Sequence, residues 1–337
     1  MIARSAAARR RPAWQAILAA AVTDPARLLA RLDLDPALLP AARAAAARFP
    51  LRVPEPWLAR IRPGDPRDPL LLQVLPLGAE RAPQPPRFRR DPLGERDALA
   101  ARGLVRKYRS RALLVATGAC AIHCRYCFRR HFPYGEGACG SRWEEALAWL
   151  ARHPEVDEVI LSGGDPLALP DATLAALAGA LEAVPHLRRL RIHTRLPVAI
   201  PARVDEGLAA WLGGLRRLQA VVVVHVNHAR EIDGEVAGAL ARLRALGVTL
   251  LNQSVLLRGV NDDAATLAAL SERLFEAGVL PYYLHLLDPV EGAAHFEVPE
   301  DEARALHAAL AAALPGYLVP RLAREEPGAP AKTFLGA

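Results

Sequence analysis

Three cysteines lie close together in a short stretch that directly follows a run of apolar residues. Cys120, Cys124 and Cys127 have C-x3-C-x2-C spacing, and residues 112–116 before them are Ala-Leu-Leu-Val-Ala. Thiolates this close can meet at one inorganic centre only if the backbone curls around it, so we predict a loop that leaves a β-strand. Cysteine thiolates are the usual ligands of iron–sulfur clusters. Three ligands leave one iron of a [4Fe–4S] cluster without a cysteine, which favours a catalytic cluster.

A zinc site and plain reduced thiols are the alternatives to a cluster. Zinc could borrow His123 or His131, but zinc-binding sequences prefer paired C-x2-C units, and this chain has no second pair. A disulfide framework is disfavoured, because three of the four cysteines are crowded together. The fourth, Cys139, lies outside the spacing and is not expected to be a ligand. This cysteine usage indicates a reducing compartment, so we expect a cytoplasmic protein.

Charge and hydropathy argue against a membrane protein and leave nucleic-acid binding as a secondary hypothesis. No apolar run approaches the roughly 20 residues of a membrane-spanning helix. The net charge of +7 permits contact with nucleic acid, but the arginines are scattered rather than gathered in one patch. We therefore expect no nucleic-acid partner, although an iron–sulfur enzyme that modifies RNA remains an alternative.

Apolar strand-like runs alternate with helical patterns after residue 110. This alternation favours β/α units with a parallel sheet. About six units are too few for a closed eightfold barrel, so we predict an α/β fold with an incomplete (β/α)6 TIM-like barrel at 106–290. Residues 1–105 would form a helical subdomain and connector, and 291–337 a C-terminal segment. The predicted strands are 112–116, 158–161, 190–193, 220–226, 249–256 and 279–286. The predicted helices between them are 142–152, 171–183, 203–213, 231–246 and 263–276.

A Ser-Gly-Gly-Asp-Pro sequence at 162–166 follows the second predicted strand. Two glycines there would let the backbone approach a ligand closely, although an ordinary turn would also explain them. One β/α unit after the cysteine triplet, this sequence resembles the radical S-adenosylmethionine (radical SAM) superfamily. The resemblance implies that the open iron binds S-adenosylmethionine and cleaves it to a 5′-deoxyadenosyl radical. The residues implied around S-adenosylmethionine are Ser162, Gly163, Gly164, Asp165 and Arg195.

The chain more closely resembles the lysine 2,3-aminomutase family, and within it the short-chain members that make β-lysine for elongation factor P. The matching segments occur in the family's order along nearly the whole chain. They lie at 107–111, 120–134, 162–167, 225–228, 251–257, 281–285, 292–296 and around 332. The resemblance implies a barrel of the radical SAM type. It also implies the conversion of (S)-α-lysine to (R)-β-lysine by migration of an amino group.

The same family uses pyridoxal phosphate. An isolated lysine near a C-terminus is usually a solvated surface charge, but Lys332 stands in a matching Glu-x6-Lys-Thr context. The resemblance implies that Lys332 is the catalytic lysine that binds the cofactor covalently. It implies Arg111, with Lys107 and Tyr108, for the phosphate, since a guanidinium fork matches phosphate oxygens in pairs. Gln253 and His225 are implied as further cofactor contacts.

Three charged residues are implied for the substrate, which would be free lysine. Arg129 would bind its carboxylate, while Asp288 and Glu325 would bind the distant ammonium through charge-assisted hydrogen bonds. The long-chain members carry Asp at the position of Glu325 and have downstream cysteines that bind zinc, which this chain lacks. Their oligomeric state is therefore less certain to apply, and a homo-oligomer stays open.

The implied partners are elongation factor P and its lysine ligase, which would use the product. An aminomutase for arginine or glutamate is an alternative, but a glutamate enzyme would need a cation where Asp288 and Glu325 stand. A cluster-bearing structural or sensing protein would have no use for an open iron beside Gly163 and Gly164. The family resemblance therefore favours an isomerase.

Overall fold

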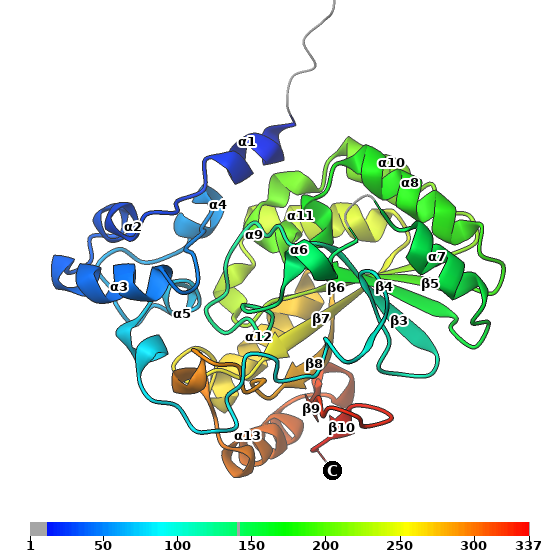
Figure 1. Cartoon of the computed structure of the whole chain (residues 1–337). Helices are drawn as coiled ribbons and strands as arrows, with labels where there is room; N and C mark the ends of the chain where they lie inside the picture. The colour runs from blue at the N-terminus through cyan, green and yellow to red at the C-terminus, as the bar shows by residue number, and fades with distance from the viewer. Residues whose placement is uncertain (1–11, 140–141, 337) are drawn as a thin grey trace, which may run out of the picture.

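A single sheet lies at the centre of the computed structural model, which describes residues 12–139 and 142–336 (Figure 1). The described strands lie in the sheet in the same order as in the chain, β1 to β10. Their bounds are β1 Leu99–Ala101, β2 Leu104–Val105, β3 Arg111–Thr117, β4 Glu158–Gly163, β5 Arg189–Thr194, β6 Gln219–Val224, β7 Thr249–Val255, β8 Leu280–His285, β9 Arg321–Arg324 and β10 Thr333–Phe334.

The strands from β3 to β9 are all parallel, and antiparallel strands flank them at both edges. No pairing joins β1 to β10 within the described residues, so the barrel is incomplete, as the sequence predicts. The prediction of six parallel strands missed β9, which comes from the C-terminal segment. Its sequence, Arg-Leu-Ala-Arg, has charged ends and only two apolar residues, so no apolar run marks it.

The helices pack around the sheet, and the crossover helices between parallel strands match the predicted helices to within a few residues (Figure 1). Asp205, Asp233 and Asp263 cap α10, α11 and α12, each accepting a backbone N–H at 3.0, 2.9 and 2.8 Å. The helix bounds are α1 Ala13–Ala19, α2 Pro25–Arg31, α3 Leu39–Ala46, α4 Glu55–Leu58, α5 Pro69–Leu72, α6 Tyr134–Gly137, α7 Glu144–Ala151, α8 Asp171–Glu182, α9 Leu196–Ala199, α10 Glu206–Leu212, α11 Gly234–Ala245, α12 Ala264–Glu276 and α13 Glu300–Ala313. Among the described helices, none is both long and apolar enough to cross a membrane.

The N-terminal helices α1 to α5 form a layer beside the sheet and contact the loop that carries the cysteines (Figure 1). The backbone N–H of His123 donates to the carbonyl of Arg52 at 3.0 Å, and that of Arg125 donates to the carbonyl of Gln73 at 2.9 Å. The His123 ring Nδ1 lies 2.8 Å from the carbonyl oxygen of Pro50. The N-terminal layer therefore holds the backbone of the cysteine loop in place.

A buried carboxylate, Glu80, strengthens this attachment. It accepts two hydrogen bonds from Arg125, at 2.8 and 2.6 Å, and one from Arg130 at 2.6 Å. Burial alone would raise the pKa of Glu80, but the two guanidinium groups hold the pKa below its usual value. Because the pKa is lowered by folding, the stabilisation is present above about pH 4.5 and is lost as the pH falls further.

We expect Glu80→Gln to lower the free energy of unfolding by about 3 kcal/mol, because it leaves two buried guanidinium groups without their anion. Urea unfolding of the apoprotein at neutral pH would measure this loss. The matched control is Glu300→Gln, which breaks exposed pairs with Arg304 on α13 and Arg324 on β9 and should leave the midpoint unchanged. Equal effects of the two substitutions would contradict the prediction.

Candidate active site

The three cysteines lie in the loop after β3, as the sequence predicts. Burial and the neighbouring thiols raise the pKa of Cys127 to about 11 and that of Cys120 well above its usual value. As free thiols Cys120 and Cys127 would therefore be neutral, and a bound metal would be needed to hold these two as thiolates. No three His, Cys, Asp or Glu side chains in the described chain can hold a single ion. A four-iron cluster has a different requirement, because each thiolate binds a different iron.

The glycine turn after β4 packs against the backbone of the cysteine loop. Gly163 has a positive φ of 119°, and a Cβ there would lie 2.5 Å from the Thr117 carbonyl oxygen. A Cβ on Gly164 would lie 2.4 Å from the carbonyl oxygen of Ala119. The glycines are therefore required for contact between two loops. Any role in binding S-adenosylmethionine would come in addition to this contact.

Asp165 connects the same turn to the end of β5. Its carboxylate accepts hydrogen bonds from the Thr194 hydroxyl at 2.7 Å and from the backbone N–H groups of Arg195, Leu196 and Leu167 at 2.7, 3.0 and 3.0 Å. These protein donors engage both of its oxygens. The structure therefore gives Asp165 a positional role, and its contact with S-adenosylmethionine stays a prediction.

Arg195 and His225 meet at Tyr126 of the cysteine loop, and Gln253 lies on the neighbouring strand β7. Arg195 Nη1 donates to the Tyr126 hydroxyl at 2.8 Å, and His225 Nε2 lies 2.7 Å from the same oxygen. The backbone of Gln253 also acts on the His225 ring and favours its protonated form. Burial and the charge of Arg195 lower the pKa of His225 well below its usual value, so its imidazole is neutral.

One cavity brings together two predicted segments that are far apart in the chain. Side chains from β3, β5 and β8 form part of its wall. The predicted residues that line it are Lys107, Tyr108, Arg111, Glu325 and Lys332. The structure thus brings together all the groups predicted for the pyridoxal phosphate anion and its lysine.

Charges of alternating sign run through this cavity. Glu325 accepts from Lys107 at 3.1 Å and from Lys332 through its other oxygen. Burial alone would raise the pKa of Glu325, but the two ammonium groups lower it to about 2. The Lys332 ammonium also lies over the Tyr283 ring, 5.6 Å from its centroid, and the Arg111 guanidinium lies 4.1 Å from that of Tyr108. Glu325 is therefore a carboxylate anion whose two described partners are lysines.

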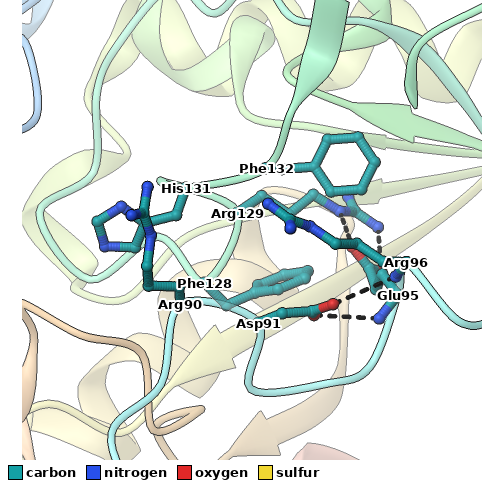
Figure 2. A pocket seen from close by; sticks show the side chains of 8 residues that line it. All are labelled: Arg90, Asp91, Glu95, Arg96, Phe128, Arg129, His131 and Phe132. Carbon is teal, nitrogen blue, oxygen red and sulfur yellow. Dashed lines mark hydrogen bonds and ion pairs between the residues drawn. The ribbon is translucent and has the colours of Figure 1, made fainter. Parts of the chain in front are cut away.

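Arg129 is buried, and a carboxylate that the sequence analysis missed already occupies one edge of its guanidinium. Its Nε and Nη2 donate to Glu95 at 2.7 and 2.8 Å (Figure 2), while Nη1 donates to the Ser162 hydroxyl at 2.8 Å and the Gly163 carbonyl at 3.3 Å. Glu95 also lies 3.6 Å from Lys107. It thus connects the predicted substrate arginine to the lysines of the larger cavity.

The turn at 91–96 explains why Glu95 points inward. Asp91 accepts the backbone N–H groups of Glu95 and Arg96 at 3.0 and 3.2 Å, and Gly94 has a positive φ of 62° (Figure 2). The sequence feature that could have predicted this turn is Asp91 four residues before Glu95, with Gly94 between them. A second, smaller cavity borders Arg129 and Glu95 at this turn.

The sequence analysis also missed Arg191, His193 and Tyr283, which line the larger cavity. Arg191 and His193 are two residues apart on β5, so they share one face of the strand. The Nε2 atom of His193 is buried without a partner among the described residues. Burial and the charge of Arg191 lower the pKa of His193 well below its usual value, which leaves a neutral imidazole facing the cavity. Polar and apolar residues alternate in 189–194, and this pattern could have predicted that Arg191 and His193 share one face of the strand.

Comparison with known proteins identifies the family. The L-lysine 2,3-aminomutase of Escherichia coli strain K12 is 52% identical over 324 residues, which cover 96% of this chain and 94% of that relative. The chain belongs to the L-lysine 2,3-aminomutase family. The enzyme of the same name from Haemophilus influenzae is 50% identical over 322 residues, which cover 95% of each chain. Residues 114–270 match the Radical SAM superfamily, so this is a family of isomerases within that superfamily.

Two further similarities concern length and fold. The L-lysine 2,3-aminomutase of Clostridium subterminale is 35% identical over 280 residues, and the match covers 82% of this chain and 66% of that longer relative. The crystal structure of Streptococcus suis SuiB bound to S-adenosylmethionine aligns with a TM-score of 0.50 at 13% identity. The alignment covers 66% of this chain and about half (52%) of that one. The second similarity supports the radical SAM fold alone.

Loss of a cysteine ligand should remove the cluster. We expect Cys124→Ala to reduce bound iron from about four atoms per chain to well below one, because two thiolates hold a four-iron cluster poorly. Anaerobic reconstitution followed by iron and sulfide determination would measure this loss. Cys139→Ala is the control and should keep the wild-type iron content, since Cys139 lies outside the ligand spacing. Equal losses in both variants would show that the ligands are misassigned.

Proposed function

We propose that this chain converts (S)-α-lysine to (R)-β-lysine, using a [4Fe–4S] cluster, S-adenosylmethionine and pyridoxal phosphate. The observation that carries the proposal is the position of the lysines. The chain contains only two lysines among 43 basic Lys and Arg residues, and both Lys107 and Lys332 line the same cavity. A primary amine can form a carbon–nitrogen double bond with an aldehyde, which a guanidinium cannot do. A chain so rich in arginine therefore keeps its lysines where an aldehyde cofactor would require one.

The residues around the cavity fit pyridoxal phosphate. Arg111 and Lys107 supply cationic donors for a phosphate, and Lys332 supplies the amine. The unpartnered Nε2 of His193 supplies a neutral polar contact. When bound, the cluster with S-adenosylmethionine would supply the radical that removes hydrogen, and pyridoxal phosphate would activate the migrating amino group. The chain's own task would be to position the reactants and exclude water.

The charges next to the cavity fit a free basic amino acid. Arg129 keeps one Nη2 hydrogen without a described partner, on the edge that Nη2 shares with Nη1, where a carboxylate could bind. Asp288 makes no hydrogen bond through its carboxylate to any described residue, and the charges of Glu325 and Lys332 act on it. A substrate ammonium would supply Asp288 with the cationic partner that Glu325 already finds in the two lysines. The same two acids would repel the side chain of glutamate, so an arginine 2,3-aminomutase is the closer alternative.

The use of the product is the furthest extension of this proposal. Its support is the similarity to two relatives named L-lysine 2,3-aminomutase along almost their whole length. We propose that a separate ligase attaches the product to elongation factor P, and that the enzyme acts in the reducing cytoplasm, where its thiols can hold a cluster. Neither step requires the enzyme itself to bind elongation factor P.

The central experiment offers candidate substrates to the anaerobically reconstituted protein. Iron, sulfide, pyridoxal phosphate, S-adenosylmethionine and a reductant are supplied, and lysine, arginine and glutamate are tested separately. We expect β-lysine from lysine, together with no β-arginine or β-glutamate. No β-lysine from a protein with a full cluster would overturn the proposal, and β-arginine alone would support the alternative.

Borohydride reduction tests the cofactor lysine independently of turnover. Reduction traps an imine as a stable amine, and peptide mass analysis can locate it because there are only two lysines. We expect the pyridoxyl group on Lys332, and no labelling in Lys332→Ala. Lys107→Arg is the control and should keep the label on Lys332. Labelling of Lys107, or of neither lysine, would contradict the assignment.

Protonation of Asp288 should make kcat/KM for lysine depend on pH. Burial and the nearby Glu325 carboxylate raise the pKa of Asp288 to about 7. Below that pH Asp288 is neutral and attracts an ammonium less, so kcat/KM for lysine should fall up to about tenfold per pH unit. Initial rates between about pH 6 and 8.5 would measure this fall in kcat/KM, the acidic limb of the pH profile. Asp288→Asn should lower kcat/KM and remove the limb, whereas Asp301→Asn on α13 should keep it. An unchanged limb in Asp288→Asn would refute the assignment.

A further inference from the structure

Arg195 makes a contact with the cysteine loop that the sequence analysis did not foresee. Its Nη1 atom lies 2.8 Å from Cys124 Sγ and donates to the Tyr126 hydroxyl at the same distance. The side chain is buried, and its Nε has no partner in the described part of the chain. The guanidinium therefore places a fixed positive charge against one of the three predicted cluster ligands.

Three side chains hold this guanidinium in place. Its Nη2 donates to Gln73 Oε1 at 2.6 Å and to Glu231 Oε2 at 2.9 Å. The guanidinium carbon also lies 4.4 Å from the centroid of the Trp57 ring, which adds a cation–π contact. Gln73 and Trp57 belong to the N-terminal layer. Orientation of Arg195 thus depends on a part of the chain outside the barrel.

Glu231 is itself fully engaged, which makes the arrangement rigid. Its Oε1 accepts from Gln73 Nε2 at 3.0 Å and from the backbone N–H groups of Asn227 and His228 at 3.0 and 3.2 Å. Neither Arg195 nor Glu231 can move without leaving a buried charge unpaired. The distance between the guanidinium and Cys124 is therefore a property of the fold.

We propose that Arg195 is a positioning residue that sets the reduction potential of the cluster through its contact with Cys124. The inference rests on the proposed ligation of a cluster by Cys120, Cys124 and Cys127. Reduction adds negative charge to a cluster, and hydrogen bonds and positive charge at the cysteine sulfur stabilise that charge. Arg195 thus makes the cluster easier to reduce, and Glu231 moderates this effect by opposing the charge of Arg195. The N-terminal layer contributes through Gln73 and Trp57.

Arg195 and Glu231 carry opposite charges. Removing each charge in turn therefore distinguishes an effect on the reduction potential of the cluster from a purely structural role. Arg195→Gln removes the positive charge and should lower the equilibrium constant for one-electron reduction about tenfold, which is 59 mV. Glu231→Gln removes the opposing charge and should raise that constant. The potentials are measured by redox titration monitored by electron paramagnetic resonance, on anaerobically reconstituted protein without S-adenosylmethionine. Iron content is determined for every sample.

A buried arginine away from the cysteines supplies the matched control. Arg203 is also buried, but its described partners are the Leu167 carbonyl and the carboxylates of Asp171 and Asp205. Arg203→Gln should therefore leave the potential of the cluster unchanged. A shift equal to that of Arg195→Gln would show that loss of any buried arginine perturbs the cluster, and would overturn the proposal.

Other results of the redox titrations and iron determinations also test the role of Arg195. Shifts in the same direction for Arg195→Gln and Glu231→Gln, or a change below twofold in iron-loaded Arg195→Gln, would overturn the inference. If Arg195→Gln does not retain iron, Arg195→Lys takes its place, because it keeps the charge. Full iron and a reduction constant within about threefold of wild type would then support the proposal, and failure to load would overturn it. Absence of a cluster from the wild-type protein would instead count against the ligand assignment itself.

Discussion

Five charged side chains of alternating sign hold the active-site region together: Arg129, Glu95, Lys107, Glu325 and Lys332. They come from the cysteine loop, the connector before the barrel, and the C-terminal segment. Removal of such charges from water costs several kcal/mol each unless every one has a partner, so the chain is stable only when all three segments are in place. Glu325 and Lys332, which lie between β9 and β10, thus join the C-terminal segment to Lys107 at the larger cavity.

The same constraint explains which parts of the molecule can be predicted from the sequence. The cysteine loop and the crossover helices follow from local spacing and periodicity, and the structure confirms both. Glu95 could not be assigned in this way, because its partner Arg129 lies 34 residues away and an acid in a turn usually faces water. The strand β9 was missed for a related reason. Its position depends on pairing with β8 rather than on an apolar run of its own.

The structure gives some predicted residues a structural role, while their predicted role stays a prediction. Gly163, Gly164 and Asp165 were predicted around S-adenosylmethionine, but here they pack the turn after β4 against the cysteine loop and the end of β5. Arg195 likewise contacts Cys124 and Tyr126. A short motif therefore leaves the task of each residue undetermined, since the sequence does not show which backbone atoms lie nearby.

The choice between lysine and arginine gives the clearest connection from composition to chemistry. Arginine binds phosphate through two parallel hydrogen bonds, which suits Arg111, and it stays charged in any environment. The role proposed for Lys332 needs an amine that can lose its proton and form a covalent bond, which arginine could not supply. Lys107 needs a different property. Its compact ammonium lies between the carboxylates of Glu95 and Glu325, at 3.6 and 3.1 Å, where the planar fork of arginine would favour one of them. Lysine at 107 therefore connects Arg129 and Glu95 on one side to Glu325 and Lys332 on the other.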